Sequence, residues 1–350
     1  MSRRFLIVTL ITVLSLILFS TVYFLMMNTS AKKAPKTEVE YIHNEGQAQG
    51  TTYSITYQQP EGIDLQQKIE DAFHRFDSSL STYNKQSIIS SINQNDSTVR
   101  TDSLFEVMFN EAQKISVLTN GALDITVGPL VKAWGFAFGN ADHSKLPNVA
   151  DFKSFVGYKK VRIQDHQLIK EDPRIMIDAN SIAQGLSADV VAKLLSDNGC
   201  KNYMVEIGGE IVCRGLNAKG LKWSIGIDKA IDDITGTNEQ LQTIIHITDC
   251  AVTTAGGYRK FYKKDGKKYS HIINPHTGYP VENNVLSVTV VAPTGIQADG
   301  FDTPLMVLGV DSALNVCKRV KGMDCYIIYT DKQGKMQEVY SDGFKKYLTE

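Results

Sequence analysis

The stretch from residue 269 to residue 308 constrains the fold of this chain more than any other, because turns, a strand and a helix must follow one another within it. Turn dipeptides at residues 274–275 and 277–278 predict that His271 lies where an extended segment enters a tight loop. Residues 285–292 are rich in Val and bounded by Asn and Pro, which is typical of a strand. A catalytic or binding site is therefore expected in this stretch.

A short polar cluster precedes the apolar run at residues 305–308. If a helix begins there, Asp299 and Thr303 are separated by one turn and share a face. Two oxygen ligands beside the free amides of a helix start would suit Mg²⁺ and a phosphorylated ligand. The structural alternative is that Asp299 or Asp302 caps the helix and Pro304 occupies its first turn. Spacing alone leaves both interpretations open.

The composition predicts a large folded domain and argues against nucleic acid as a partner. With 350 residues, 43% of them hydrophobic, the chain can bury a sizeable core. Lys and Arg total 37 against 38 Asp and Glu, so no overall basic field would attract nucleic acid. Partners must therefore be inferred from individual sites.

The N-terminus differs from the rest of the chain in composition. Arg3 and Arg4 precede an uncharged apolar stretch, residues 5–27, which is long enough to cross a bilayer as a helix. A cleaved signal peptide normally has a shorter apolar region, although the small residues 29–31 could serve as a cleavage site. We expect a single-pass anchor in the inner membrane, with the bulk of the chain on the periplasmic side.

These observations divide the chain into three segments. Residues 1–27 are expected to form the membrane anchor or signal sequence, residues 28–40 a polar linker, and residues 41–350 the functional domain.

The cysteines indicate little about function. They are Cys200, Cys213, Cys250, Cys317 and Cys325, without a CxxC pair or zinc-finger spacing. Their odd number rules out full pairing within the chain, so most are expected to be small core residues. Cys317 and Cys325 could form a bridge in an oxidising compartment.

From residue 41 onward the sequence predicts a mixture of helices and strands. Helical periodicity occurs at residues 65–80, 102–118, 181–199 and 311–320, the second capped by Asp102 or Ser103. Strand patterns occur at residues 50–57, 175–178, 223–228, 243–248 and 325–330. Paired glycines within residues 203–212, at positions 208 and 209, indicate a close backbone approach. Composition and pattern alone therefore support only a mixed α and β class.

Several residues between these elements are candidates for a site. The turn between Asp178 and Ser181 joins a strand to a helix and leaves backbone groups open for a ligand. Asp124 lies in an apolar run and needs partners if it is buried, either backbone amides or a ligand. The basic run at residues 259–264 could contact phosphate or an acidic partner, although a solvated hairpin tip is the simpler interpretation. No P-loop and no dinucleotide GxGxxG motif is present, so nucleotide binding would require another architecture.

Nine blocks, taken in order, resemble the ApbE family of FAD:protein FMN transferases. They are GTTYSI, LSTYNKQS, GALDITVGPLVKAWGF, IDANSIAQGLSADVVA, VEIGGE, TTAGGYRKFY, SHIINPHTGYPV, SVTVVAP and ADGFDTPLMVLG. The resemblance extends from about residue 50 to residue 308. It implies an α+β domain with a central antiparallel sheet and flanking helices, similar to the T-fold, with FAD between its two halves.

The resemblance also implies an activity and the residues for it. Such enzymes split FAD, release AMP and join FMN to a Thr of a target protein through a phosphoester. By resemblance, His271 is the catalytic base, and Mg²⁺ is bound by Asp299, Thr303 and the backbone carbonyl of Ser181. Asp302 would lie beside the metal. The residues expected to line the FAD site are Tyr83, Ala122, Leu123, Asp124, Asp178, Gln184 and Ile273.

The implied partners are extracytoplasmic flavoprotein subunits of sodium-pumping quinone reductase or Rnf type, and FMN-binding domains with a Ser/Thr-Gly-Ala-Thr type motif. Two alternatives remain open: a pyrophosphatase that gives free FMN and AMP, and a flavin-binding protein without catalysis. The sequence departs from the family pattern at Gln49, Gln184 and Asn274. Its first cysteine is Cys200, so the lipid attachment found near the N-terminus of many relatives is excluded.

Overall fold

The computed structural model describes residues 19–23, 40–137, 146–231, 240–258 and 260–349. The chain divides into two units, residues 1–39 and residues 40–350, and the elements below belong to the second. Residues 19–23 are helical, and no helix within the described ranges is both long and apolar enough to span a bilayer. Apart from residues 19–23, the expected anchor lies outside the described residues.

The strands of the second unit are mostly short. They are β1 (Ile42–Ala48), β2 (Thr51–Tyr57), β3 (Val161–Gln164), β4 (Gln167–Lys170), β5 (Tyr203–Ile207), β6 (Glu210–Arg214), β7 (Trp223–Asp228), β8 (Leu241–Ile247), β9 (Cys250–Gly256), β10 (Phe261–Lys264), β11 (Lys267–Ser270), β12 (Val285–Ala292), β13 (Asp324–Thr330) and β14 (Met336–Tyr340).

The helices lie between these strands in the sequence. They are α2 (Gln66–Leu80), α3 (Ile88–Asn93), α4 (Ser103–Leu118), α5 (Gly128–Ala133), α6 (Ala183–Asp197), α7 (Gly295–Leu308) and α8 (Val310–Arg319). Short 3₁₀ turns are η1 (Val149–Asp151), η2 (Tyr158–Lys160) and η3 (Asp342–Tyr347).

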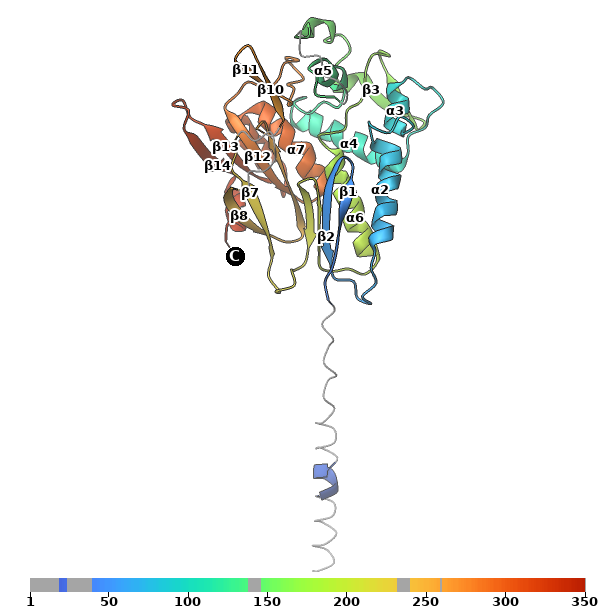
Figure 1. Ribbon diagram of the computed structural model, residues 1–350, viewed down its shortest axis with the longest axis vertical. Helices are drawn as coiled ribbons and strands as arrows, with labels where there is room; N and C mark the ends of the chain where they lie inside the picture. Colours follow the sequence, from blue (N-terminus) through green and yellow to red (C-terminus); the bar gives the residue numbers. More distant parts are fainter. Residues whose placement is uncertain (1–18, 24–39, 138–145, 232–239, 259, 350) are drawn as a thin grey trace, which may run out of the picture. The chain divides into compact units, whose positions relative to one another are not determined.

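An eight-stranded sheet organises the described part of the chain (Figure 1). Its order is β1-β2-β5-β6-β9-β12-β13-β14, and every neighbouring pair is antiparallel. The ribbons β3–β4, β7–β8 and β10–β11 lie outside this sheet. The expected α+β class with a central antiparallel sheet is therefore confirmed.

The central strands are buried on both faces of the sheet. In β12, Val288 and Val290 belong to the main hydrophobic core, whereas Val291 belongs to a second core on the opposite face. In β13, Ile327 and Ile328 divide between the two cores in the same way. Side chains alternate along a strand, so a strand covered on both faces is apolar throughout. This explains why the run at residues 285–292 could be recognised as a strand.

Helices cover one face of the sheet, and α6 packs against α7 with almost no side chain between them. A Cβ added at Gly185 would lie 2.2 Å from the carbonyl oxygen of Gly295, and one at Gly295 would lie 2.3 Å from that of Gly185. Only glycine permits two backbones to approach this closely. The contact brings the first turn of α6 against α7 and so assembles the site described below.

Helix α7 begins earlier than the sequence predicted. Its first residue is Gly295, and Asp189 of α6 accepts hydrogen bonds from the amides of Gly295 (2.7 Å) and Ile296 (2.9 Å). Asp299 therefore lies within the helix, as do Asp302 and Pro304, and the interpretation of these residues as a cap and a first-turn proline is wrong. The first two backbone amides of α7 are not free for a ligand either, because they already donate hydrogen bonds to a carboxylate of another helix.

The remaining predicted elements agree with the structure, with one exception. Asp102 caps α4 by accepting the amide of Phe105 at 2.8 Å, as expected. The predicted strand at residues 175–178 contains only an isolated bridge between Val127 and Met176. Beside this bridge, the segment contacts residues 125–127 through the hydrogen bond from the Asp178 amide to the Ile125 carbonyl at 2.7 Å.

Candidate active site

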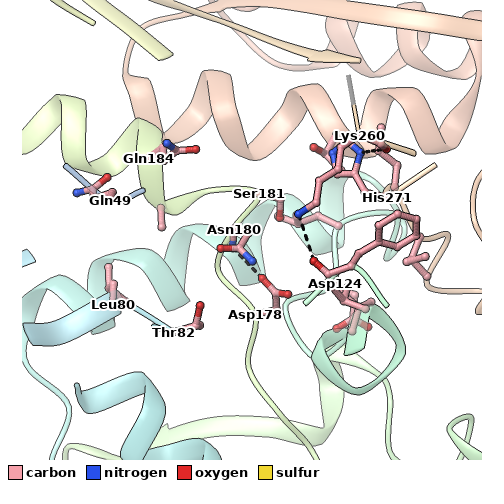
Figure 2. A pocket seen from close by; sticks show the side chains of 18 of the residues that line it. Gln49, Leu80, Thr82, Asp124, Asp178, Asn180, Ser181, Gln184, Lys260 and His271 are labelled. Atoms are coloured by element: carbon pink, nitrogen blue, oxygen red, sulfur yellow. Dashed lines mark hydrogen bonds between the residues drawn. The ribbon is translucent and has the colours of Figure 1, made fainter. Parts of the chain in front are cut away.

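A cavity of about 340 Å³ opens beside the first turn of α6 and the base of the β10–β11 hairpin (Figure 2). Its wall includes every residue expected to contact FAD, namely Tyr83, Ala122, Leu123, Asp124, Asp178, Gln184 and Ile273. Ser181, His271 and Thr303 line the same cavity. The structure thus brings together residues that are as much as 220 positions apart in the sequence, from Tyr83 to Thr303.

Asp299 lies just behind this wall and is fixed by the first turn of α6. Its side chain is buried, and its Oδ2 accepts the backbone N–H of Gly185 at 2.8 Å. If α6 began one turn earlier, that amide would instead pair with the carbonyl of Ser181. The Ser181 carbonyl therefore lacks this helical partner, and Ser181 lines the cavity.

Thr303 supplies another oxygen atom that could bind a metal ion, in addition to those of Asp299 and Ser181. Its hydroxyl donates a hydrogen bond to Asp302 Oδ1 at 3.1 Å, which leaves the lone pairs of Thr303 available to a ligand. A carboxylate, a hydroxyl and a carbonyl are hard oxygen ligands of the kind that Mg²⁺ prefers. Among the described residues, no cluster of three or more His, Cys, Asp or Glu could hold a metal. A cation here would depend on the mixed donor set of Asp299, Thr303 and Ser181.

The charge in this region also fits a cation. Burial, together with the nearby Asp189 carboxylate, raises the pKa of Asp299 to about 7. Burial and the charge of Asp299 hold the pKa of Asp302 well above its ordinary value, and Glu210 is affected in the same way. Glu210 Oε2 is buried without a hydrogen-bond partner in the described part of the protein. Carboxyl groups crowded in this way retain protons unless a positive charge compensates them.

His271 is held in one tautomer by the residue that begins the hairpin. Its Nδ1 lies 3.0 Å from the carbonyl oxygen of Lys260, which also accepts the His271 backbone amide at 3.1 Å. A carbonyl can only accept, so Nδ1 carries the proton and Nε2 has the free lone pair. Burial and the positive charge of Lys260 lower the pKa of His271 below its ordinary value. The imidazole is therefore neutral at pH 7 and can act as a base.

Asp124 has the structural environment that a buried carboxylate requires. It accepts hydrogen bonds from the amides of Thr126 and Tyr158, both at 2.8 Å, and from the Thr126 hydroxyl at 2.6 Å. Burial nevertheless raises its pKa. Asp124 thus shapes the cavity wall by tying together segments on either side of it, and a direct contact with FAD stays a prediction.

Asp178 and Tyr83 form the opposite part of the wall. Asp178 accepts the amide of Asn180 at 2.9 Å, and burial raises its pKa while the charge of Lys260 opposes that rise. The pKa of Tyr83 is raised by burial and by the Asp178 charge, so the two side chains are close. Tyr83 is 48% exposed and lies at the rim.

Gln184 extends from the first turn of α6 to the β5–β6 turn. A Cβ added at Gly208 would lie 2.7 Å from Gln184 Nε2, and Gly208 has a φ of +64°. Glycine at position 208 therefore leaves room for the Gln184 side chain, whereas a Cβ added at Gly209 would meet nothing within 4 Å.

Other residues of the cavity wall were not predicted from the sequence. Lys260 lines the cavity and donates to the carbonyl of Phe136 at 3.2 Å, although the basic run was expected at a solvated hairpin tip. Phe136 and Asn180 also line the cavity. The sequence does not show where each lysine of the basic run lies in the hairpin. The strand register places Lys260 at the end of the β10–β11 ribbon that is far from the turn.

The sequence and the fold of this chain are similar to those of a known family. The profile of the ApbE family matches residues 49–327. The FAD:protein FMN transferase of Vibrio cholerae is 39% identical over 321 residues, which cover 89% of this chain and 91% of that protein. The FAD:protein FMN transferase of Escherichia coli K12 is 34% identical over 332 residues, 90% of this chain and 91% of that protein.

Solved structures agree with these similarities. The flavin transferase ApbE from Vibrio cholerae superposes with a TM-score of 0.78 at 37% identity, covering 88% of this chain and 99% of that one. The apo flavinyl transferase ApbE from Pseudomonas stutzeri gives a TM-score of 0.78 at 27% identity, covering 88% and 97%. The chain belongs to the ApbE family.

Proposed function

We propose that this protein is an FAD:protein FMN transferase, which moves FMN from FAD to a Thr hydroxyl of another protein and releases AMP. The observation that carries the proposal is the geometry at His271. In a chain of this family, its free Nε2 faces the cavity that also contains Ser181 and Thr303, with Asp299 directly behind. A base and a set of oxygen donors in one cavity suit phosphoryl transfer.

His271, Lys260 and the proposed metal ligands have different roles in the transfer of FMN. Nε2 of His271 accepts the proton of the incoming Thr hydroxyl as its oxygen forms a bond to the FMN phosphorus. The bond between that phosphorus and the bridging oxygen breaks, and AMP leaves with the electron pair. Lys260 contributes positive charge beside the phosphates. Mg²⁺, held by Asp299, Thr303 and the Ser181 carbonyl, would neutralise charge on the pyrophosphate.

A single assay distinguishes the candidate activities. The full-length chain is incubated with FAD, Mg²⁺ and an FMN-binding domain that carries an acceptor Thr. A fluorescent flavin band that survives denaturing electrophoresis supports the transferase. Free FMN without such a band supports the pyrophosphatase, and unchanged FAD supports a binding protein. A target domain with Thr replaced by Ala is the control, and labelling of that domain would contradict attachment at Thr.

We further propose that the targets are periplasmic flavoprotein domains, and that the apolar residues 5–27 anchor the enzyme in the inner membrane. Protease added to intact spheroplasts should then digest the catalytic domain. Protection of that domain until the membrane is lysed would overturn this orientation.

A further inference from the structure

The β10–β11 hairpin connects His271, the candidate general base, to an exposed surface rich in lysine. Lys260 immediately precedes the first strand of the hairpin, and His271 immediately follows Ser270, the last residue of its second strand. Residues 260–270 contain five lysines and one acidic residue, Asp265. Because the chain as a whole has a net charge of −1, this positive charge is a local feature.

The two faces of the hairpin differ. On the inner face, Tyr269 stacks on Trp134 with their ring centroids 5.6 Å apart, and the ring centroids of Tyr262 and Phe136 are 5.5 Å apart. Lys267 also belongs to this face and forms an ion pair with Glu282 at 2.6 Å. The inner face is therefore fixed against the protein.

The outer face presents Phe261, Lys263 and Lys268, which alternate with the inner residues along the two strands. Lys268 Nζ lies 4.1 Å from the Phe261 ring centroid, and both lysines are exposed. Lys263 and Lys268 are direct cross-strand partners. Two lysines on one exposed face make that face positively charged, which complements an anionic partner.

We propose that this outer face, formed by Phe261, Lys263 and Lys268, docks an acidic stretch of the acceptor protein beside its modified Thr. The inference rests on the proposed function, because a macromolecule must bring a hydroxyl to His271. Lys268 precedes His271 by three residues, which corresponds to about 10 Å along an extended strand. The acidic side chains of an extended acceptor segment would therefore lie about three residues from the Thr.

The test uses one FMN-binding domain in two versions, with Asp or with Lys at the positions flanking the acceptor Thr. Full-length wild-type enzyme should modify the Asp version with roughly tenfold lower KM at low salt, and the difference should shrink as salt is raised. In the Lys263→Glu, Lys268→Glu double variant this preference should disappear or reverse, with similar kcat at saturation. FAD binding should be unchanged, since neither lysine lines the cavity.

A matched control exists on another hairpin. Lys332 and Lys335 are exposed at the β13–β14 turn and do not line the cavity. The Lys332→Glu, Lys335→Glu variant should keep the wild-type preference. Equal losses in both double variants, or an unchanged preference in the Lys263 and Lys268 variant, would overturn the docking site.

Direct binding separates failure of docking from failure of the proposed function. Fluorescence anisotropy of the labelled Asp version, measured without FAD, should show salt-dependent binding to wild type that the Lys263 and Lys268 variant lacks. Such binding without any FMN transfer would contradict the transferase proposal, but it would still support a docking face for an acidic protein. If wild type instead binds only vesicles of anionic lipid through these lysines, the hairpin is a membrane contact and the inference is wrong.

Discussion

At the scale of single residues, main-chain groups fix the chemistry of the site. The Lys260 carbonyl selects the tautomer of His271, and the Gly185 amide orients Asp299. Neither interaction depends on the identity of a second side chain. The site should therefore keep its geometry when surrounding side chains such as Gln49 and Gln184 are substituted.

His271 should determine the acidic limb of the pH–rate profile. Because its pKa is lowered, the neutral form should persist below the ordinary His range, and transfer should slow only when the pH falls through that lowered value. The same shift means that protonation of His271 on acidification favours the unfolded state, so its contribution to stability is lost as pH falls. His271→Ala should slow transfer about 10²- to 10⁴-fold, remove this limb and retain FAD binding.

The pH–rate profile of transfer, with FAD affinity measured in parallel, tests this role. His246→Ala, on the distant β7–β8 hairpin, serves as the control and should behave as wild type. An unshifted acidic limb in His271→Ala would remove the assignment of the base.

Asp299 should control the response to Mg²⁺. Asp299→Ala removes the carboxylate from the proposed donor set, so transfer should fall by about a hundredfold or more. The Mg²⁺-induced rise in thermal midpoint, measured without FAD, should vanish as well. Asp342→Ala changes an exposed carboxylate of η3 and should leave both responses intact. Wild-type Mg²⁺ dependence in Asp299→Ala would exclude this metal site.

At the scale of elements, the packing of α6 on α7 builds the site. The Gly185–Gly295 contact brings the two helices together, and Asp189 of α6 caps α7. The first turn of α6 in return supplies the amide that holds Asp299. Helix α6 therefore caps the start of α7 and also fixes the Asp299 side chain of α7. The two helices are expected to form and unfold as one unit.

Gly185→Ala should destabilise this pair. The added Cβ would lie 2.2 Å from a backbone carbonyl oxygen and 2.6 Å from Asp299 Cβ, so the helices must separate. We expect a loss of about 3 kcal/mol, seen as a fall of several degrees in the thermal midpoint, together with weaker Mg²⁺ binding. At Gly257 an added Cβ would make ordinary contacts, the nearest at 3.6 Å, so Gly257→Ala is the matched control. Equal midpoints for the two variants would show that the contact is not as tight as described.

Local patterns predicted the elements well, and long-range partners explain what they missed. The strand at 285–292 and the helix capped by Asp102 are encoded within short windows of sequence. The start of α7 was misplaced because its cap, Asp189, lies 106 residues earlier. Lys260 was assigned to solvent because the tyrosines that anchor its hairpin do so through Trp134 and Phe136, far away in the sequence. The family resemblance identified ten of the 24 residues that line the cavity, but not the backbone interactions that hold them.

At the scale of the whole molecule, one sheet connects the site to two distant thiol pairs. Cys213 and Cys250 are direct partners in the register of β6 and β9, and the Cys213 thiol donates a hydrogen bond to the Cys250 carbonyl oxygen at 3.5 Å. The Cys325 side chain of β13 raises the pKa of the Cys317 thiol of α8, so these two side chains also lie close together. Both pairs lie in the core, and all five cysteines are buried and free of disulfides.

Oxidative refolding should convert these pairs into disulfides. Directly opposed residues of antiparallel strands have Cα atoms about 4.5–5.5 Å apart, within the range that a disulfide spans. Refolding in a buffer of reduced and oxidised glutathione should link Cys213 to Cys250 and Cys317 to Cys325, leaving Cys200 as the alkylatable thiol. Each bridge should add roughly 2–4 kcal/mol to stability. Peptide mass mapping checks the pairing, and scrambled links or three alkylated thiols would contradict it.

The amide-bound carboxylates around the cavity have a consequence for how a flavin enters. Asp124, Asp178 and Asp299 each already accept a backbone N–H, so the recess has its shape before any nucleotide arrives. Little ordering entropy then remains to be lost on association. Crystals grown without flavin should accordingly take up the dinucleotide by soaking, turn yellow and keep their lattice.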